Sequence, residues 1–345
     1  MRTTKPLLTR RLFSATLAAA VAIGAVPLAG AASAADAKPD AIRIGSTAPG
    51  HFKFILFRHQ KLLEKEFEAD GIPVELTTFD GGSAASVALG SGALDVTYIG
   101  NNPSLRLAAS GANVKLIGLS SWLPSNETLV LTRVDSDIQT LGDLKGRRVG
   151  YLAGTVRHST FAKALEAQGL SIDDVESLNI GIESSGPALA RGDIDAIVEG
   201  QGVAQRLVEA GQARIVFDAA KDGRPEWAVP HVISVNGDFA QRYPAIVERI
   251  LKVDIAAAEW VDANPEEAIS IFVQETGNSE AAVRATYADG RFYQNPEITP
   301  AAVEALKGEE AFMAKAGLLQ GSVDYDRWID RSFLEAATAE RTAGN

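Results

Sequence analysis

Cysteine is absent from the 345 residues of this chain. Its absence excludes a disulfide framework, a thiolate metal site, a catalytic thiol and a lipid-bearing cysteine anchor. Positive charge is also scarce, because 33 Lys and Arg stand against 44 Asp and Glu, for a formal net charge of −11. An acidic chain lacks the basic stripes that neutralise phosphates, so the composition predicts no nucleic-acid partner.

Three enzyme signatures are missing as well. The sequence has no Gly-x-Ser-x-Gly elbow, no His-Glu-x-x-His helix, and no Gly-x-Gly-x-x-Gly after its first expected strand. These motifs supply a serine nucleophile, two zinc ligands and a dinucleotide cradle, respectively. We therefore expect neither catalysis, nor a metal, nor a cofactor.

The first 34 residues have the pattern of an export signal. Four basic residues precede an apolar run over residues 12–30, which leads to the small-residue cleavage site Ala32-Ser33-Ala34. Thr9-Arg10-Arg11-Leu12-Phe13 resembles the twin-arginine pattern, which leaves both the twin-arginine route and ordinary secretion open. Cleavage near Ala34 removes four basic and no acidic residues, which changes the net charge from −11 to −15. We expect a protein that diffuses freely in a periplasm.

The remainder alternates short β-rich runs with helical stretches, which is typical of an α/β chain with mostly parallel sheets. The pattern also restarts, because Gly92–Gly100 resembles Gly192–Gly200 at an offset of 100 residues. We expect two similar lobes. The first half should hold strands over 42–45, 74–79, 94–99 and 114–118 and helices over 54–68 and 103–109; the second should hold strands over 148–151, 175–180 and 194–198 and helices over 159–168 and 187–191.

Two apolar runs, 128–132 and 231–235, are expected to carry the chain into the second half and out of it. The segment after His231 is mainly helical, including 247–261 and 301–316. If these two runs are the crossings, the C-terminal helices return to the first lobe. Two consecutive independent α/β domains are the alternative.

Four loops follow expected strands and open helices, which is where open α/β sheets bind ligands. Glycine permits sharp turns there, and the free N–H groups of helix starts attract anions. Three histidines fall in these loops or on a crossing run. Trp122 follows a strand, where it offers an aromatic wall, core packing or a hinge contact. The loops span 46–51, 100–103, 153–158 and 199–202, and the histidines are His51, His158 and His231.

Several motifs resemble the periplasmic solute-binding proteins of ABC importers, of the sulfonate, taurine and nitrate type. They are Leu141–Gly150, the following Gly154–His158, the turn Gly192–Ala196 and the helix start Asn264–Ala268. The resemblance implies an α/β, two-lobed periplasmic binding protein fold of type II with two hinge strands. It places lobe 1 at 41–130 and 232–340 and lobe 2 at 131–231.

The same resemblance implies a monomer that captures a small anionic solute and delivers it to a permease and ATPase at the inner membrane. An enzyme on the same scaffold and a sensory protein that presents its ligand stay open as alternatives. The residues expected to bind the ligand are Thr47, His51, Gly100, Asn101, Trp122, Thr155, Arg157, His158, Glu199 and Gln201.

One departure from the family concerns the strand that ends at Glu199. Sulfonate binders typically continue this strand into Trp-Asp-Pro, whereas this chain has Glu199-Gly200-Gln201. A carboxylate at this position favours a ligand with an amino or hydroxyl donor, such as taurine, unless Glu199 is turned to solvent.

Overall fold

The computed structural model of this chain describes residues 38–47, 52–123, 128–222, 224, 227, 229–286 and 296–342. The expected export signal at 1–34 lies outside these ranges, and so does His51. From Ala37 to Asn345 the chain forms one compact unit. Within the described ranges, no helix combines the length and the apolar character needed to cross a bilayer.

The first sheet has five strands in the order β2-β1-β3-β10-β4. β1 pairs in parallel with β2 and β3, whereas β10 runs antiparallel between β3 and β4. The strand of this sheet that comes last in the sequence is thus inserted near its centre. The bounds are β1 (Ile42–Thr47), β2 (Val74–Phe79), β3 (Val96–Gly100), β4 (Val114–Leu123) and β10 (Val229–Asn236).

The second sheet repeats this arrangement with the order β7-β6-β8-β5-β9. β6 pairs in parallel with β7 and β8, and β5 runs antiparallel between β8 and β9. The antiparallel strand again takes the fourth place in the order. The bounds are β5 (Leu129–Arg133), β6 (Arg148–Tyr151), β7 (Glu176–Asn179), β8 (Ala196–Glu199) and β9 (Ala213–Asp218).

The internal repeat is confirmed down to individual hydrogen bonds. Asp95, before β3, accepts a hydrogen bond at 2.7 Å from the backbone N–H of Arg43 at the start of β1. Asp195, before β8, accepts one at 2.9 Å from the backbone N–H of Arg148 at the start of β6. Equivalent carboxylates, Asp95 and Asp195, therefore fix equivalent strand pairs, β1 with β3 and β6 with β8.

The chain passes from the first sheet to the second between β4 and β5, and returns between β9 and β10. The runs predicted to cross, 128–132 and 231–235, correspond to β5 and β10. Each belongs to the sheet that the chain has just entered and is the antiparallel strand of that sheet. The lobe limits at 130/131 and 231/232 stay predictions.

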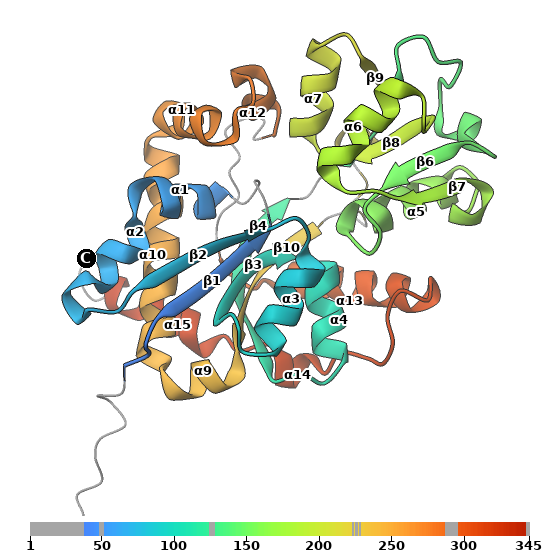
Figure 1. The fold of residues 1–345 in the computed structure, drawn as a ribbon. Helices are drawn as coiled ribbons and strands as arrows, with labels where there is room; N and C mark the ends of the chain where they lie inside the picture. Colours follow the sequence, from blue (N-terminus) through green and yellow to red (C-terminus); the bar gives the residue numbers. More distant parts are fainter. Residues whose placement is uncertain are drawn as a thin grey trace, which may run out of the picture. The chain divides into compact units, whose positions relative to one another are not determined.

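Helices cover both faces of the first sheet. One face packs on α1 (Phe52–Gln60), α2 (Leu62–Phe67), α10 (Pro244–Ala263), α11 (Pro265–Thr276) and α15 (Ser332–Thr342). Figure 1 shows the orange helices α10 and α11 beside the blue helices α1 and α2, far apart in sequence. The C-terminal helices therefore do return to the first sheet. The other face packs on α3 (Gly82–Gly90), α4 (Asn101–Ala109), α13 (Pro300–Lys315) and α14 (Tyr325–Trp328).

The second sheet is covered in the same way by fewer helices. α5 (Val156–Ala167) buries Phe161 and Leu165 against one face. α6 (Ile182–Arg191) and α7 (Gln201–Glu209) bury Leu189 and Ala204 against the other. Because α4, α5 and α7 each start directly after a strand or a short loop, three helix N-termini lie at the carboxyl ends of strands.

Two helix predictions are wrong in detail. The helix expected over 54–68 is broken at Lys61, whose φ of 52° costs about 1–2 kcal/mol in a non-glycine residue. The break directs Phe57 of α1 and Phe67 of α2 into the same core cluster, which offsets that cost. The helix expected at 187–191 begins at Ile182 and contains Pro187. Proline forfeits one backbone hydrogen bond in a helix, and the burial of its neighbours offsets this loss.

Candidate functional site

The carboxyl ends of β3 and β8, together with β10, bring together residues from both sheets. Gly100 ends β3 and lies opposite His231 of β10 in the strand register. A Cβ atom at Gly100 would stand 3.2 Å from Val156 Cγ2, at the start of α5, and 3.9 Å from His231 Cδ2. We call Gly100, Arg157, Glu199, Gly200 and His231 the strand-end cluster.

Arg157 lies across the end of β8. Its Nη2 atom would be only 2.5 Å from a Cβ atom at Gly200, so that glycine at this position leaves the space that the guanidinium fills. The Nε atom of Arg157 is buried and has no hydrogen-bond partner. An unpaired buried guanidinium nitrogen is costly, and a bound anion would relieve that cost.

Glu199 is 2% exposed, so the alternative in which it is turned to solvent is wrong. Its Oε2 atom is buried without a hydrogen-bond partner. Burial raises the pKa of Glu199, and the nearby charge of Arg157 opposes this shift. Opposite charges thus lie close together here, yet in the described part of the chain no ion pair joins these two side chains.

His231 is not a cation at neutral pH. Burial, followed by the charge of Arg157, lowers the pKa of His231 to about 4. The neutral imidazole can donate or accept a hydrogen bond, but it adds no positive charge for an anion. Arg157 is therefore the cationic member of the strand-end cluster.

Thr155 and His158 hold the loop before α5. The hydroxyl of Thr155 donates to Leu152 O at 2.7 Å and accepts from the backbone N–H of His158 at 3.4 Å, which caps the helix. His158 Nδ1 accepts from the backbone N–H of Gly154 at 3.1 Å, and its ring stacks on Tyr151 at 4.8 Å between centroids. Burial lowers the pKa of His158. Both residues thereby position Arg157.

The other predicted residues divide between the strand ends and the core. Asn101 is 1% exposed, and its side-chain carbonyl accepts from the backbone N–H of Asn102 at 2.8 Å. Trp122 packs against a hydrophobic cluster under β4, as its packing alternative implies. Thr47 ends β1 and Gln201 begins α7, and both are half-buried. Contact of any of these residues with a ligand stays a prediction.

A polar network beside the cluster escaped the sequence analysis. Asn102 of α4 donates to Ser159 Oγ of α5 at 2.6 Å and to Glu309 Oε1 of α13 at 2.8 Å. Glu309 is also ion-paired with Lys163 of α5. Arg106 of α4 donates to Gly154 O at 2.9 Å. Asn102 belongs to one of the four predicted loops, but Glu309 follows it by 207 residues and no motif marks it.

A second set of contacts lies between α7 and the segment that follows α11. Arg206 Nη1 donates to Asn278 Oδ1 at 2.6 Å, and Ser279 Oγ donates to Glu209 Oε1 at 2.7 Å. A Cβ atom at Gly202 would stand 3.0 Å from Asn278 Nδ2. Helices that cover the two sheets are therefore joined through α4, α5 and α13 and also through α7.

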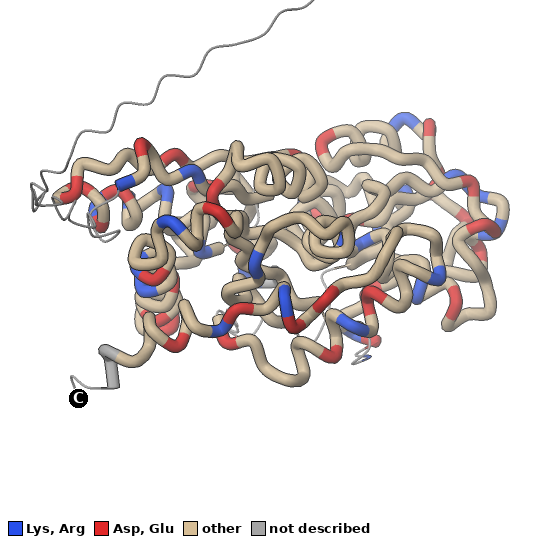
Figure 2. The backbone as a smooth tube through the Cα atoms, turned by 90° about the horizontal axis from the view of Figure 1, so that it is seen from below, with Lys and Arg blue, Asp and Glu red and all other residues tan. Residues whose placement is uncertain are grey.

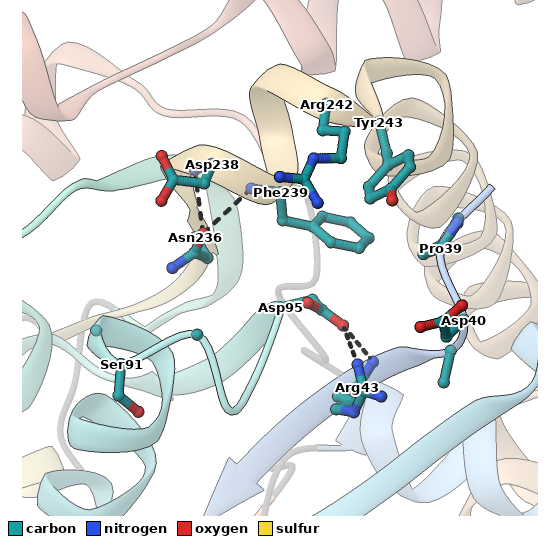
Figure 3. Close-up of a pocket in the computed structure, with 13 residues that line it drawn as sticks. Pro39, Asp40, Arg43, Ser91, Asp95, Asn236, Asp238, Phe239, Arg242 and Tyr243 are labelled. Carbon is teal, nitrogen blue, oxygen red and sulfur yellow. Dashed lines mark hydrogen bonds and ion pairs between the residues drawn. The ribbon is translucent and has the colours of Figure 1, made fainter. Parts of the chain in front are cut away.

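A cavity of about 320 Å³ lies elsewhere, at the opposite end of β1 and β3. Three of its polar groups already have structural partners, as the dashed lines of Figure 3 show: Asp95 binds Arg43, and Asn236 accepts from the backbone of Asp238 and Phe239. The bond from Arg43 to Asp95 has its counterpart between Arg148 and Asp195 in the second sheet. These groups therefore hold the sheet rather than mark a ligand site.

Charge of either sign is spread along the chain. Figure 2 shows Lys and Arg interspersed with Asp and Glu over the described backbone. With a net charge of −11, attraction of an anion must come from the local arrangement at Arg157 and the helix starts. Among the described residues, no group of three or more His, Asp or Glu side chains is arranged to hold a metal ion.

Two sheets of equivalent order, between which the chain crosses twice, define the two-lobed periplasmic binding protein fold of type II. The profile of the NMT1/THI5-like family matches residues 66–268. That match spans more than half of the sequence, and the chain therefore belongs to the NMT1/THI5-like family.

The taurine-binding periplasmic protein of Escherichia coli (strain K12) is 26% identical over 279 residues, which cover 77% of this chain and 85% of that protein. The alkanesulfonate-binding protein SsuA from Xanthomonas axonopodis pv. citri, solved with MOPS, superposes with a TM-score of 0.76 at 22% identity, covering 86% of this chain and 99% of that one. A mutant of DSZB, solved in complex with biphenyl-2-sulfinic acid, superposes with a TM-score of 0.69 at 21% identity, covering 87% and 99%. At these identities the two structures support the fold alone.

Proposed function

We propose that this chain is the extracytoplasmic substrate-binding component of an ABC importer, which captures a small anionic solute of the sulfonate or taurine type between its two lobes and delivers it to the permease. One observation carries the proposal: the buried Nε of Arg157 has no partner at the point where strand ends of both sheets meet. The relatives named for taurine and alkanesulfonate binding support this choice of solute.

The surroundings of Arg157 suit an anion. Gly100 and Gly200 are the N-caps of α4 and α7, and neither supplies a side chain to cap its helix. Helix N-termini attract negative charge, and a guanidinium binds planar or tetrahedral oxyanions through paired hydrogen bonds. Closure of the lobes on a solute with higher affinity for the closed state then follows by population shift.

The proposed location is the periplasm, after removal of the signal near Ala34, and the twin-arginine route is the proposed path of export. The proposed partners are the small-molecule ligand and a permease with its ATPase at the inner membrane. The protein would act as a monomer without a cofactor. The periplasmic relative from Escherichia coli supports this location.

An enzyme on the same scaffold is the second candidate, because another solved structure with this fold is that of the desulfurization enzyme DSZB. The chain has no cysteine, so that any catalysis could not use a thiol. None of the five residues of the strand-end cluster carries a hydroxyl, although that of Ser185 lies beside the Glu199 carboxylate. Turnover of a bound acid, followed by chromatography, would favour this candidate.

Calorimetric titration of taurine and ethanesulfonate into the wild type and an Arg157→Gln variant tests the proposal. We expect binding to the wild type and a loss of roughly tenfold to hundredfold in affinity in the variant, because a charge-assisted hydrogen bond is removed. Arg191→Gln is the matched control, since Arg191 is exposed and paired with Asp193. Equal affinity in Arg157→Gln and the wild type would contradict the assignment.

A further inference from the structure

The strand-end cluster contains two opposite charges that are each incompletely satisfied. Arg157 Nε and Glu199 Oε2 are both buried and both lack a hydrogen-bond partner. The charge of Arg157 acts on Glu199, yet no ion pair between them is formed in the described residues. A site for a simple anion would need only the guanidinium and would leave the carboxylate unexplained.

Structural contacts account for only part of the Glu199 carboxylate group. The hydroxyl of Ser185 and the backbone N–H of Gly200, which precedes α7, stabilise its ionised form, and the positive charge of Arg206 of α7 has a smaller effect in the same direction. A carboxylate at a helix start is favourable in itself. The Oε2 atom is shielded from water and still has no hydrogen-bond donor.

We propose that the ligand is a zwitterion, with an acidic head bound by Arg157 and a protonated amine bound by Glu199. This inference rests on the proposed function and narrows its substrate class from small acids to amino acids in the broad sense, aminosulfonates and aminocarboxylates alike. Glu199 is then the residue that discriminates an amino acid from the same acid without the amine. The neutral His231 beside them adds no charge that would compete with either head.

The expected discrimination follows from the cost of burying an unpaired charge. When the amine is absent, Glu199 Oε2 stays unsatisfied in the bound state, whereas the amine supplies a charge-assisted hydrogen bond. Such a bond corresponds to a ratio of dissociation constants of roughly tenfold to hundredfold. The ratio should hold for sulfonates and for carboxylates, because the head group is common to both members of each pair.

Calorimetry on the full-length protein with two matched pairs of acids tests the proposal. The pairs are taurine with ethanesulfonate and β-alanine with propionate, titrated into the wild type, Glu199→Gln and Glu183→Gln. Glu183 is an exposed carboxylate on α6, close in sequence to Ser185, and serves as the control. We expect the aminated member of at least one pair to bind at least about tenfold more tightly to the wild type and to Glu183→Gln. In Glu199→Gln the ratio should fall to roughly threefold or less, with ethanesulfonate bound no more weakly than before.

Equal affinities within each pair in the wild type would overturn the zwitterion and leave the proposed function intact. A Glu199→Gln variant that keeps the ratio would overturn the role of Glu199, and circular dichroism establishes that this variant is folded. Should it fail to fold, the wild-type ratio decides. If none of the four acids binds to the wild type, the proposed function fails, and this proposal fails with it.

Discussion

At the residue scale, the strand-end cluster is shaped by what two glycines leave open. Gly200 has no side chain and so leaves space for the guanidinium of Arg157, and Gly100 lets β3 approach Val156 and His231. Substitution of either glycine by alanine would bring a Cβ atom against these groups. The Asp95 and Asp195 carboxylates, by contrast, are engaged in holding strand pairs.

Part of this site could be predicted from the sequence. Arg157, Glu199 and Gly100 follow from the rule that ligands bind beyond the carboxyl ends of strands. Gly100 and Glu199 end β3 and β8, and Arg157 lies in the first turn of α5, the helix that follows β6. The distances among them could not be predicted, because they depend on how α5 and β10 meet. Glu309 could not be predicted at all, because α13 reaches the site from a distant part of the chain and has no local pattern that marks it.

The raised pKa of Glu199 predicts a dependence of stability on pH. Because burial raises the pKa of Glu199 in the folded protein, the folded state holds this proton more tightly than the unfolded state. The free energy of unfolding therefore falls as the pH rises from the ordinary glutamate value of about 4.3 through the raised value. Glu199→Gln should remove this contribution, so its stability relative to the wild type should increase between about pH 4 and about pH 8.

Urea unfolding of both proteins without ligand, at the two ends of that range, measures the difference. The comparison isolates Glu199 because the other buried carboxyls of the described residues, Asp95, Asp254 and Glu309, are common to both proteins. A relative stability of Glu199→Gln that is constant with pH, or that decreases as the pH rises, would contradict the account.

At the scale of elements, α1 and α10 are joined by a fully buried ion pair. Lys53 Nζ lies 2.5 Å from Asp254 Oδ2, and their side chains are 1% and 0% exposed. Removing one partner of such a pair leaves an uncompensated charge in the core, which typically costs about 3–5 kcal/mol. Apolar or neutral replacement of both partners costs much less.

Lys53→Met should therefore lower the free energy of unfolding by about 3–5 kcal/mol, and Lys53→Met with Asp254→Asn should recover a large part of this loss. The exposed pair of Arg284 and Glu266 is the control, where Arg284→Met should change stability far less than Lys53→Met does, because water screens an exposed ion pair. Equilibrium denaturation measures all three variants. A double variant less stable than Lys53→Met would show that the pair is not the source of the effect.

Element boundaries show where local reasoning from the sequence ends. The strands β2 and β6 were predicted at their observed limits, because runs such as Val74–Phe79 and Arg148–Tyr151 are bounded by turn residues. The break at Lys61 and the early start of α6 follow from tertiary packing, which no local pattern of residues contains.

At the scale of the whole molecule, the sequence repeat and the sheet order agree. Two sheets with the same strand order and the same Asp-to-backbone bond follow the two halves of the repeat. Helices of the two sheets are joined around the strand-end cluster by Asn102, Lys163 and Arg206. A solute bound at Arg157 would contact groups that both sheets contribute, and binding would therefore stabilise the whole fold.

The most direct test of the central claim, that this fold binds a small acid at Arg157, is the free energy of unfolding measured against ligand concentration. With taurine above its Kd, the account predicts that the free energy of unfolding of the wild type rises by about 1.4 kcal/mol for each tenfold increase in taurine, by RT ln(1 + [L]/Kd). Arg157→Gln should show this rise only at much higher concentrations. A free energy that stays constant for the wild type, or that rises equally in Arg157→Gln, would contradict the claim.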